Sequence, residues 1–442
     1  MKRPKITILC PRANATGGTE LLHQLGYKLN LLGYDAIMYY YGDADDRPTV
    51  HPHFQKYNVP VTGILEDAPG NIFIYPEAVA SSLKSVKDQL PTSKHVLWWL
   101  SVDNAFMTPS LEKEISADSS LIHFVQSYYA DDYVRTVLSV PDDRLFYLSD
   151  YINNNYLNKN TFGNREDVVL FNPRKGFERT ASLIKSSDHR IRWRALAGLM
   201  PEEIPNVLQT AKVYIDFGNH PGKDRFPREA VSCGCRIITG RRGAAANAKD
   251  IPIPDVFKLS DDTEDHTILA LIYSLIEDYD NTGEIYGSYR RMINEEFHSF
   301  ETDTLSVFSK ITGCPMEGDD LDETGLTNAI VEAVSKEEYK KAFAYLTVYR
   351  LKGYRITGDI TILESYTRLG LGEEQVALYL VNGLLDADTG NYEAYLIKAR
   401  ALIASGLPEA EEALDLAIKY STGTEDEGYI TEAAQMLREA MT

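Results

Sequence analysis

The stretch DFGNHPGKDRFPREAVSCGC, residues 216–235, begins at the end of one apolar run, Val213–Phe217, and leads into another, Arg236–Thr239. Short apolar runs of this kind are typical of strands in a parallel sheet. The segment between them begins as a loop rich in glycine and charge and continues into a helix that carries Glu229. A loop with so many charged groups is costly to build unless it faces water or a polar ligand. The stretch therefore predicts a β-α-β unit with a polar site at the carboxyl end of its first strand.

The same alternation of apolar runs and helical patterns extends on both sides of this unit. The expected strands of the second half are Val168–Phe171, Ile191–Ala197, Val213–Phe217, Arg236–Thr239 and Val256–Leu259. The expected strands of the first half are Ile6–Cys10, Ala36–Tyr41, Asn71–Tyr75, His95–Leu100, Leu121–Val125 and Leu145–Leu148. Between the first two of these, Glu20–Leu32 has a leucine stripe at helical spacing. The pattern predicts an α/β fold of two Rossmann-like domains that face each other across a cleft.

An asparagine-rich stretch, Asp150–Asn160, reads as the linker between these domains. From about Thr327 the strand pattern stops and residues 327–442 are rich in helix formers. We therefore expect three domains, at residues 1–155, 156–310 and 325–442. In the third, Leu369–Glu374 is echoed by Ala404–Ala410 at close to the 34-residue period of tetratricopeptide helix pairs. A helical bundle without repeats is the alternative, and in either case the tail is expected to bind a partner, self-associate or pack.

Charge and composition narrow the function classes. The chain has 442 residues and a formal net charge of −20, which makes nucleic acid an unfavourable partner. The four cysteines do not show a usual zinc spacing and are expected to be reduced thiols. The apolar run after the N-terminus is too short for a secretory signal, and no apolar segment reaches membrane-spanning length. We expect a cytoplasmic protein whose membrane contact, if any, is peripheral at the inner face.

Two glycine loops follow expected strands. Gly17 and Gly18 come after the first strand and open a helix, where free N–H groups favour an anion. The alternative is a tight turn in which Thr16 or Thr19 caps the helix. Arg174 and Lys175 follow the first strand of the second half, where two cations can neutralise a diphosphate leaving group. The alternative there is a charged turn.

A further set of candidates lies in the first half of the chain. Asp103 follows an expected strand and should open toward the cleft, where a carboxylate can orient or activate a hydroxyl of a substrate; the alternative is a helix N-cap or loop aspartate. Trp98 and Trp99 are expected in the core, although one of them could stack on a ring of the substrate. His123 lies within an apolar strand and is expected to be a satisfied core histidine.

Taken together, these motifs resemble the GT-B glycosyltransferases, in particular the large retaining family 4. Glu229–Gly234, EAVSCG, matches the second glutamate of that family's paired motif and its tail. Lys175-Gly176 matches the lysine-glycine that holds the donor diphosphate, and Gly17–Glu20, GGTE, matches the glycine loop of the acceptor domain. The resemblance covers about residues 1–310. It departs at Pro221, where the family has its first glutamate, and Asp224 or His220 of the same loop is the expected substitute.

The resemblance implies a role for each matched residue. Glu229 accepts hydrogen bonds from the donor ribose, and Lys175 with Arg174 stabilises the departing diphosphate. The expected catalytic residues are Lys175, Arg174, Asp103 and Asp224. The expected substrate-binding residues are Gly17, Gly18, Lys175, His220, Gly222, Lys223 and Glu229. No metal is expected, because in the family that the sequence resembles cations of the protein stabilise the departing diphosphate.

The resulting hypothesis is a glycosyltransferase of the hexosyltransferase type, metal-independent and retaining. It moves a sugar from a nucleotide diphosphate-sugar, a co-substrate rather than a cofactor, to a glycan, lipid-linked glycan or glycoprotein. The setting implied is the biosynthesis of a bacterial surface polysaccharide or glycoprotein. One alternative is a GT-B-fold sugar-nucleotide epimerase, for which no additional acid/base set is evident. The other is a catalytically retired subunit that binds a partner through its helical tail.

Overall fold

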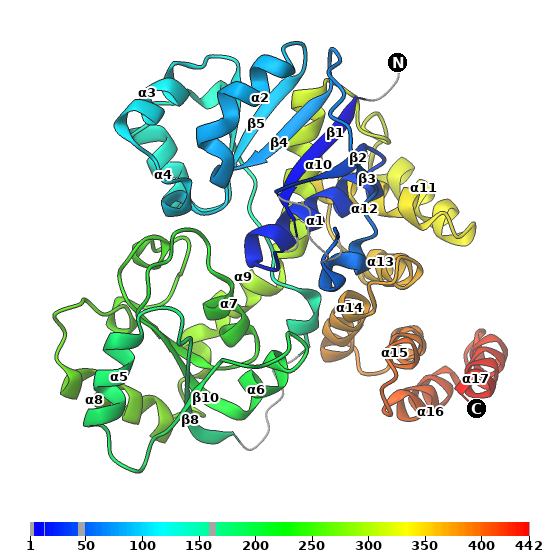
Figure 1. Ribbon diagram of the computed structural model, residues 1–442. Coiled ribbons are helices and arrows are strands. Elements are labelled where there is room, and N and C mark those ends of the chain that lie inside the picture. Colours follow the sequence, from blue (N-terminus) through cyan, green and yellow to red (C-terminus); the bar gives the residue numbers. More distant parts are fainter. Residues whose placement is uncertain (1–3, 13, 43–48, 159–164, 442) are drawn as a thin grey trace. The chain divides into compact units, whose positions relative to one another are not determined.

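The computed structural model describes residues 4–12, 14–42, 49–158 and 165–441. The chain divides into two compact units, each held together by contacts among its own residues. The first contains residues 1–30, 34–152 and 159–314, and the second contains residues 31–33, 153–158 and 315–442. Figure 1 shows the ribbon of the chain with most of its helices and strands labelled. The first unit holds both parallel sheets, and the second holds the helical tail.

The first sheet is entirely parallel, as its apolar strands predict, and its order is β3-β2-β1-β4-β5-β6-β7 within the described residues. Its strands are β1 Lys5–Pro11, β2 Asp35–Tyr41, β3 Val61–Thr62, β4 Ile72–Pro76, β5 Lys94–Trp99, β6 Leu121–Val125 and β7 Leu145–Tyr147. All but the two-residue strand β3 were expected. The order reverses between β1 and β4, and ligands of open α/β sheets bind at the carboxyl ends of strands at such a point.

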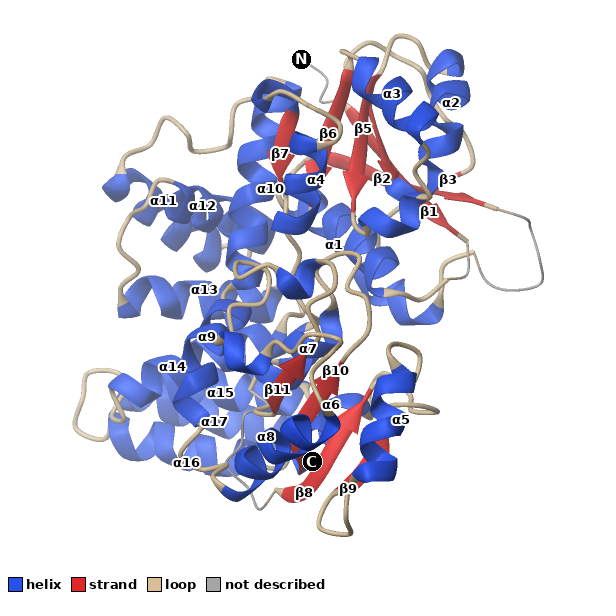
Figure 2. Cartoon of the chain, turned by 90° about the vertical axis from the view of Figure 1, so that its left-hand side faces the viewer, coloured by secondary structure: helices blue, strands red, loops and turns tan. Residues whose placement is uncertain are grey.

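Both faces of this sheet are buried under helices, visible in Figure 2. Trp99 and Leu97 pack with the helices α2 Leu83–Gln89, α3 Pro109–Ala117 and α4 Tyr128–Thr136 on one face. On the other face Phe124 contacts Trp98, and it also contacts Phe308 of α10, Glu296–Thr312, at 5.8 Å between ring centroids. Both tryptophans are fully buried, which confirms their place in the core.

The second sheet has the order β11-β10-β8-β9, and all of its strand pairs are parallel. Its strands are β8 Glu166–Phe171, β9 Arg192–Ala195, β10 Ala211–Asp216 and β11 Arg236–Thr239. Its helices are α5 Phe177–Ser186, α6 Ile204–Thr210, α7 Arg225–Ser232, α8 Asp265–Glu277 and α9 Gly287–Asn294. Here the order reverses between β8 and β10, so the loops that follow these two strands are the expected ligand loops.

One local prediction was wrong, and one segment is more buried than its composition suggests. The expected strand at Val256–Leu259 is instead a 3-10 turn at Asp255–Phe257, and only Lys258 forms a bridge with Thr239. Its proline-flanked sequence favours a turn. The expected polar linker begins with Asp150, Tyr151 and Ile152, all of which are buried. Lys159 and Asn160 of that stretch lie outside the described residues. The domain boundaries at 155 and 310 stay a prediction.

The second unit is all helical, as expected. Its helices are α11 Glu323–Ser335, α12 Tyr339–Leu351, α13 Gly358–Gly370, α14 Glu374–Ala387, α15 Tyr392–Ala404, α16 Ala410–Ser421 and α17 Glu427–Met441. Helices α13 and α15 start 34 residues apart (392 − 358), and Ala377 and Ala413 are buried at corresponding places in α14 and α16. The relation to tetratricopeptide repeats stays a prediction. No helix among the described residues is long and apolar enough to cross a membrane.

Candidate active site

The loops that follow β8 and β10 interlock through two glycines. Gly176 has φ +61°, and a Cβ atom there would lie 2.5 Å from the carbonyl carbon of Phe217. A Cβ atom on Gly218 would lie 2.4 Å from Cβ of Lys175. Only glycine at both positions lets the two loops approach this closely. The Lys175 side chain is thereby held against the start of the loop after β10, residues 217–224, which we call the charged loop.

This contact gives a first prediction, for which the chain offers a matched control. Gly176→Ala adds both a left-handed strain and a backbone clash, so it is expected to destabilise the protein by about 1–3 kcal/mol and to weaken binding of the nucleotide that the resemblance implies. Gly198→Ala is the control, because Gly198 also has positive φ but no atom of the described residues lies within 4 Å of its Cβ position. It is expected to cost about 1 kcal/mol and leave nucleotide binding intact. Thermal unfolding with and without nucleotide measures both effects, and equal behaviour of the two variants would contradict the prediction.

A chain of charged side chains runs from Lys175 into the core. Lys175 Nζ lies 2.5 Å from Oδ2 of Asp224, and both side chains are partly exposed. Nδ1 of the fully buried His220 lies 3.7 Å from that same oxygen, and its Nε2 lies 3.4 Å from Oδ1 of Asp216. Asp216 also accepts hydrogen bonds from the N–H of Gly218 and the hydroxyl of Tyr214. Burial opposes the charge on Asp216, but the adjacent His220 ring and the hydrogen bonds from Gly218 and Tyr214 hold the pKa of that carboxyl below its ordinary value.

Two other expected donor residues lie on the elements that carry Lys175 and Asp224. Arg174 is exposed on the loop after β8. Glu229 is on α7, five residues after Asp224, and is buried. The structure therefore brings Lys175, Asp224 and His220 into one cluster and places Glu229 on the helix that this cluster leads into.

The start of helix α1, Gly17–Leu31, lies next to Arg225, the residue that directly follows the charged loop. Thr16 Oγ1 accepts from the N–H of Thr19 at 3.3 Å, and Thr19 Oγ1 accepts from the N–H of Thr16 at 2.8 Å. This reciprocal pair confirms that threonine caps the helix. The N–H groups of Gly17 and Gly18 have no acceptor within the helix, because they are its first two residues. A Cβ atom on Gly17 would lie 3.0 Å from Cδ of Arg225, so glycine here lets Arg225 cross the helix end.

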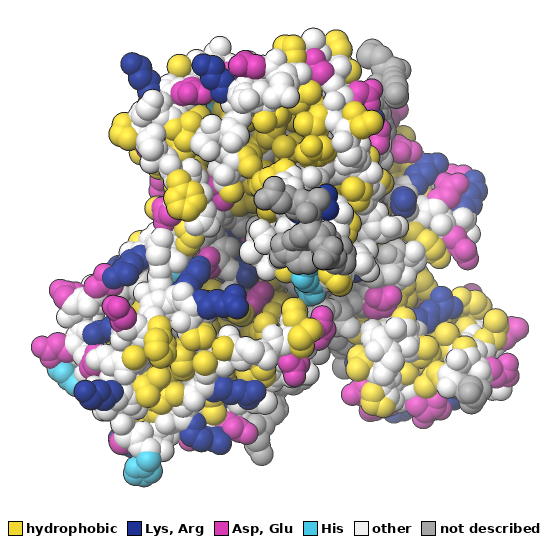
Figure 3. Space-filling model, viewed as in Figure 1, with side chains coloured by type: hydrophobic (Ala, Val, Ile, Leu, Met, Phe, Trp, Pro, Cys, Tyr) yellow, Lys and Arg dark blue, Asp and Glu magenta, His cyan; other side chains and the backbone are white. Residues whose placement is uncertain are grey.

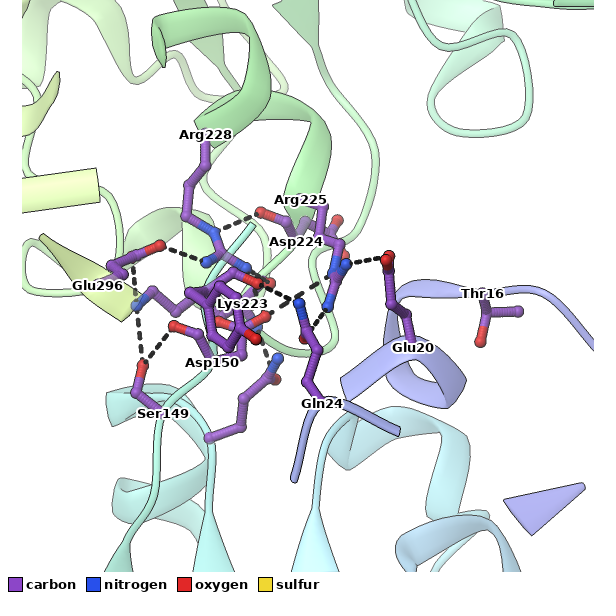
Figure 4. A network of polar contacts seen from close by, with 12 residues as sticks. Thr16, Glu20, Gln24, Ser149, Asp150, Lys223, Asp224, Arg225, Arg228 and Glu296 are labelled. Carbon is purple, nitrogen blue, oxygen red and sulfur yellow. Dashed lines mark hydrogen bonds and ion pairs between the residues drawn. The ribbon is translucent and has the colours of Figure 1, made fainter. Parts of the chain in front are cut away.

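A buried network of ion pairs, drawn in Figure 4, joins α7 to elements of the first sheet and to α10. Arg228 donates to Asp150 and to Glu296, each at 2.7 Å, and Lys223 lies 2.7 Å from Glu296 and donates to Ser149 at 2.9 Å. The three cations are Lys223, Arg225 and Arg228, and their carboxylate partners are Glu20, Asp150 and Glu296. Burial alone would raise the pKa of Asp150, yet the three cations around it keep that pKa below its ordinary value.

This network shows that part of the charged loop is buried and held by contacts within the chain. Lys223 was expected to bind substrate, but its ammonium group is buried and already paired. Gly222 is buried too, and a Cβ atom there would lie 2.1 Å from the carbonyl oxygen of Leu100, so its glycine is needed for packing. Their roles in substrate binding stay predictions. Sequence reasoning missed Arg228, Asp150 and Glu296 altogether; the one signal was the unusual charge density around Pro227.

The loop after β5 meets the same charged loop. The N–H of Val102 donates to the carbonyl of Pro221 at 2.7 Å. Asp103 lies on the 3-10 turn Val102–Ala105, is exposed, and accepts hydrogen bonds from Tyr129 and Asn219. It is not an N-cap of the following helix, where Thr108 takes that role. Asp103 is therefore close to Pro221, the position at which the resemblance departs.

The remaining candidates are structural. His123 is fully buried and its Nδ1 accepts from Trp99 at 3.1 Å, which confirms a core histidine, but its Nε2 finds no hydrogen-bond partner among the described residues and so is not satisfied as expected. Burial lowers the pKa of His123 to about 3. All four cysteines are free. Among the described residues, no three His, Cys, Asp or Glu side chains are grouped as a metal site would require.

In the face shown in Figure 3, Lys and Arg side chains are spread over the lower part of the view with Asp and Glu side chains among them. Arg174, which is exposed, and Lys175, which is partly exposed, are the cations available to an anion at the carboxyl end of β8.

Comparison with known proteins gives the fold a name. No family model and no curated protein sequence matches the chain. A glycosyltransferase from Rickettsia africae ESF-5 matches at TM-score 0.54 and 12% identity, over 70% of this chain and 99% of that one. A sucrose-phosphate synthase from Thermosynechococcus elongatus matches at TM-score 0.55 and 13% identity, over 70% and 100%. The chain therefore has the GT-B fold of such enzymes, as the resemblance implied, and identities this low establish the fold alone.

Proposed function

We propose that the protein is a metal-independent, retaining glycosyltransferase of the hexosyltransferase type. Its donor is a nucleotide diphosphate-sugar and its acceptor a glycan, lipid-linked glycan or glycoprotein. Acting in the cytoplasm, at the inner face of a bacterial membrane, it would contribute to a surface polysaccharide. The observation that carries this proposal is the pairing of Lys175 with Asp224 at the carboxyl ends of β8 and β10.

The donor diphosphate would lie between Lys175 and the start of α1. Lys175 exchanges its Asp224 partner for a phosphate oxygen, and Arg174 approaches from the exposed side of the same loop. The N–H groups of Gly17 and Gly18 supply further donors, and the positive end of the α1 dipole favours the anion. Because these cations neutralise the charge of the leaving group, no divalent ion is needed in the proposed mechanism.

Transfer then requires one bond to break and one to form. The bond between the anomeric carbon and the phosphate oxygen breaks, and the nucleoside diphosphate leaves with the bonding pair. A hydroxyl oxygen of the acceptor bonds to the same carbon, and its proton passes to the departing phosphate. Lys175 lowers the barrier by holding the charge that develops on that phosphate.

Two carboxylates would fix the rest of the donor. Glu229 accepts hydrogen bonds from the vicinal hydroxyls of the ribose. Asp224, released from Lys175, replaces the acid that is missing at Pro221 and accepts from the transferred sugar. Asp224 suits this role better than His220, because Asp224 is 20% exposed and His220 is fully buried.

A melting-curve panel tests the proposal. UDP, ADP, GDP, CDP and dTDP and their sugars are added to the parent protein and to Glu229→Ala, with and without chelator. At about one hundred times its dissociation constant, the correct ligand adds about 2.7 kcal/mol of stability to the parent. We expect one nucleotide series to shift the parent in chelator and to shift Glu229→Ala much less. No shift with any compound would sink the proposal and favour the retired-subunit alternative, to be pursued through partners of the helical tail.

A further inference from the structure

One exposed aromatic residue is held in a conformation that its side chain disfavours. Phe106 ends the turn after β5 with φ 48° and ψ 45°, and the residue is 82% exposed. The left-handed region is a genuine outlier for a bulky residue. The other non-glycine residues with positive φ in the described chain are Asn58, Ser139, Asn158 and Glu337, all of them polar. Phe106 therefore has a strained backbone conformation and yet is not buried, which points to a function at the surface.

The turn that presents Phe106 is anchored on both sides. Leu100, at its start, donates its N–H to the buried carboxylate of Glu77 at 3.0 Å. Val102 donates to the carbonyl of Pro221 in the charged loop, at 2.7 Å. Ala105, just before Phe106, is buried. The position of Phe106 is therefore fixed relative to the loop that carries the proposed donor site.

Polar groups suited to sugar hydroxyls lie on the same turn. Asp103 is three residues from Phe106, which places the two Cα atoms within about 11 Å of each other. The Asp103 carboxylate is exposed, and Tyr129 and Asn219 each donate one hydrogen bond to it. Each carboxylate oxygen keeps acceptor capacity for a further hydroxyl. Burial, followed by the charge of Asp103, raises the pKa of Tyr129, so this hydroxyl remains a donor.

We propose that Phe106 and Asp103 form the acceptor subsite and that its occupant is a saccharide ring. The ring lays its apolar C–H face on Phe106, and Asp103, held by Tyr129 and Asn219, accepts hydrogen bonds from two adjacent hydroxyls. An aromatic platform beside a few fixed polar groups gives a small ligand both area and orientation. The subsite adjoins Pro221, so it presents the acceptor hydroxyl beside the donor sugar. This inference rests on the proposed function and names the substrate class of the same site.

The test uses methyl glycosides as probes. Methyl α-D-glucopyranoside, methyl α-D-mannopyranoside, methyl α-D-galactopyranoside and methyl N-acetyl-α-D-glucosaminide are titrated singly into the full chain, and binding is followed by saturation-transfer NMR. We expect at least one glycoside to bind with saturation strongest on one C–H face of the ring. Phe106→Ala and Asp103→Asn are each expected to weaken that binding by about three- to tenfold, and Phe106→Trp to retain it. Tyr429→Ala, another exposed aromatic in the helical unit, is the matched control and should bind as the parent does.

Stability provides a second readout. Phe106→Gly relieves the left-handed strain, so it should unfold at the same temperature as the parent or higher while binding the glycoside as weakly as Phe106→Ala. A lower unfolding temperature would assign Phe106 a packing role and overturn the inference. So would parent-like glycoside binding by Phe106→Ala, or absence of binding to the parent. Nucleotide shifts in the melting panel do not depend on these variants. Their presence alongside a negative glycoside result would reject the subsite alone, and their absence would reject the proposed function.

Discussion

Replacing Lys175 with alanine is expected to lower turnover with a nucleotide diphosphate-sugar by about 30- to 1000-fold, or about 2–4 kcal/mol of barrier. The reason is the place of its ammonium group, on a loop that Gly176 and Gly218 fix at the carboxyl ends of β8 and β10. Charge on the leaving phosphate is greatest in the transition state, so a fixed cation there acts more on turnover than on donor affinity. Steady-state release of nucleoside diphosphate measures the change.

Two further variants sharpen this result. Lys175→Arg keeps the charge and should lose less than Lys175→Ala. Lys212→Ala is the matched control, because Lys212 is also a partly buried lysine in an ion pair, with Asp167, but lies near the amino end of β10. It is expected to turn over as the parent does. If Lys175→Ala and Lys212→Ala had the same activity, the leaving-group role would be wrong.

Replacing Asp224, the partner of Lys175, is expected to change nucleotide binding and turnover in opposite directions. In the absence of donor, Asp224 neutralises Lys175. Asp224→Asn frees the ammonium group, so binding of the nucleoside diphosphate alone should be unchanged or tighter. Turnover should nevertheless fall, because the carboxylate that is proposed to contact the transferred sugar is lost. A split between tighter binding and slower turnover is therefore specific to this ion-pair exchange.

The strands and the general fold could be predicted because they rest on local sequence. Strands β4 and β5 are buried along nearly their whole length, so their apolar runs are continuous and easily seen. Strand β3 has only two residues and gives no such signal. The run at Val256–Leu259 has strand composition, but Pro252 and Pro254 precede it and it forms a turn. Lys175 and Asp224 were both singled out, although their pairing across 49 residues was not visible.

The buried network could not be predicted because its partners are distant in sequence. Arg228 and Asp150 are 78 residues apart, and Arg228 and Glu296 are 68 apart. Asp150 lies in a stretch that reads as a solvated linker, and nothing local indicates that its carboxylate is fully buried. Charge density in one loop shows that polar partners exist, but does not say whether they are a ligand or other parts of the chain. Here the chain itself supplies them for Lys223, Arg225 and Arg228.

Replacing Arg228 with methionine is expected to destabilise the protein by about 3–5 kcal/mol, the usual cost of removing one partner from a buried ion pair. The guanidinium group is 1% exposed and donates to two carboxylates at 2.7 Å. Methionine fills much of the volume but leaves Asp150 buried without its main partner. Arg192→Met is the matched control, because the Arg192–Glu166 pair is more than half exposed on both sides. That variant is expected to lose no more than about 1 kcal/mol in denaturant unfolding.

The pH dependence distinguishes an unpaired charge from a simple packing defect. In the parent, the folded-state pKa of Asp150 is below its ordinary value, so its contribution is present above about pH 4 and is lost only as pH falls further. In Arg228→Met, burial is expected to outweigh the remaining cations and raise that pKa. Stability linked to Asp150 would then be greatest below about pH 4 and decrease as pH rises through the new folded value. The deficit of Arg228→Met relative to the parent should accordingly be smaller at pH 5 than at pH 7.5. Adding Asp150→Asn to Arg228→Met should recover part of the loss and remove this pH dependence. A deficit that is the same at both pH values, with no recovery in the double variant, would mean that Arg228 stabilises the fold by packing and not by its charge.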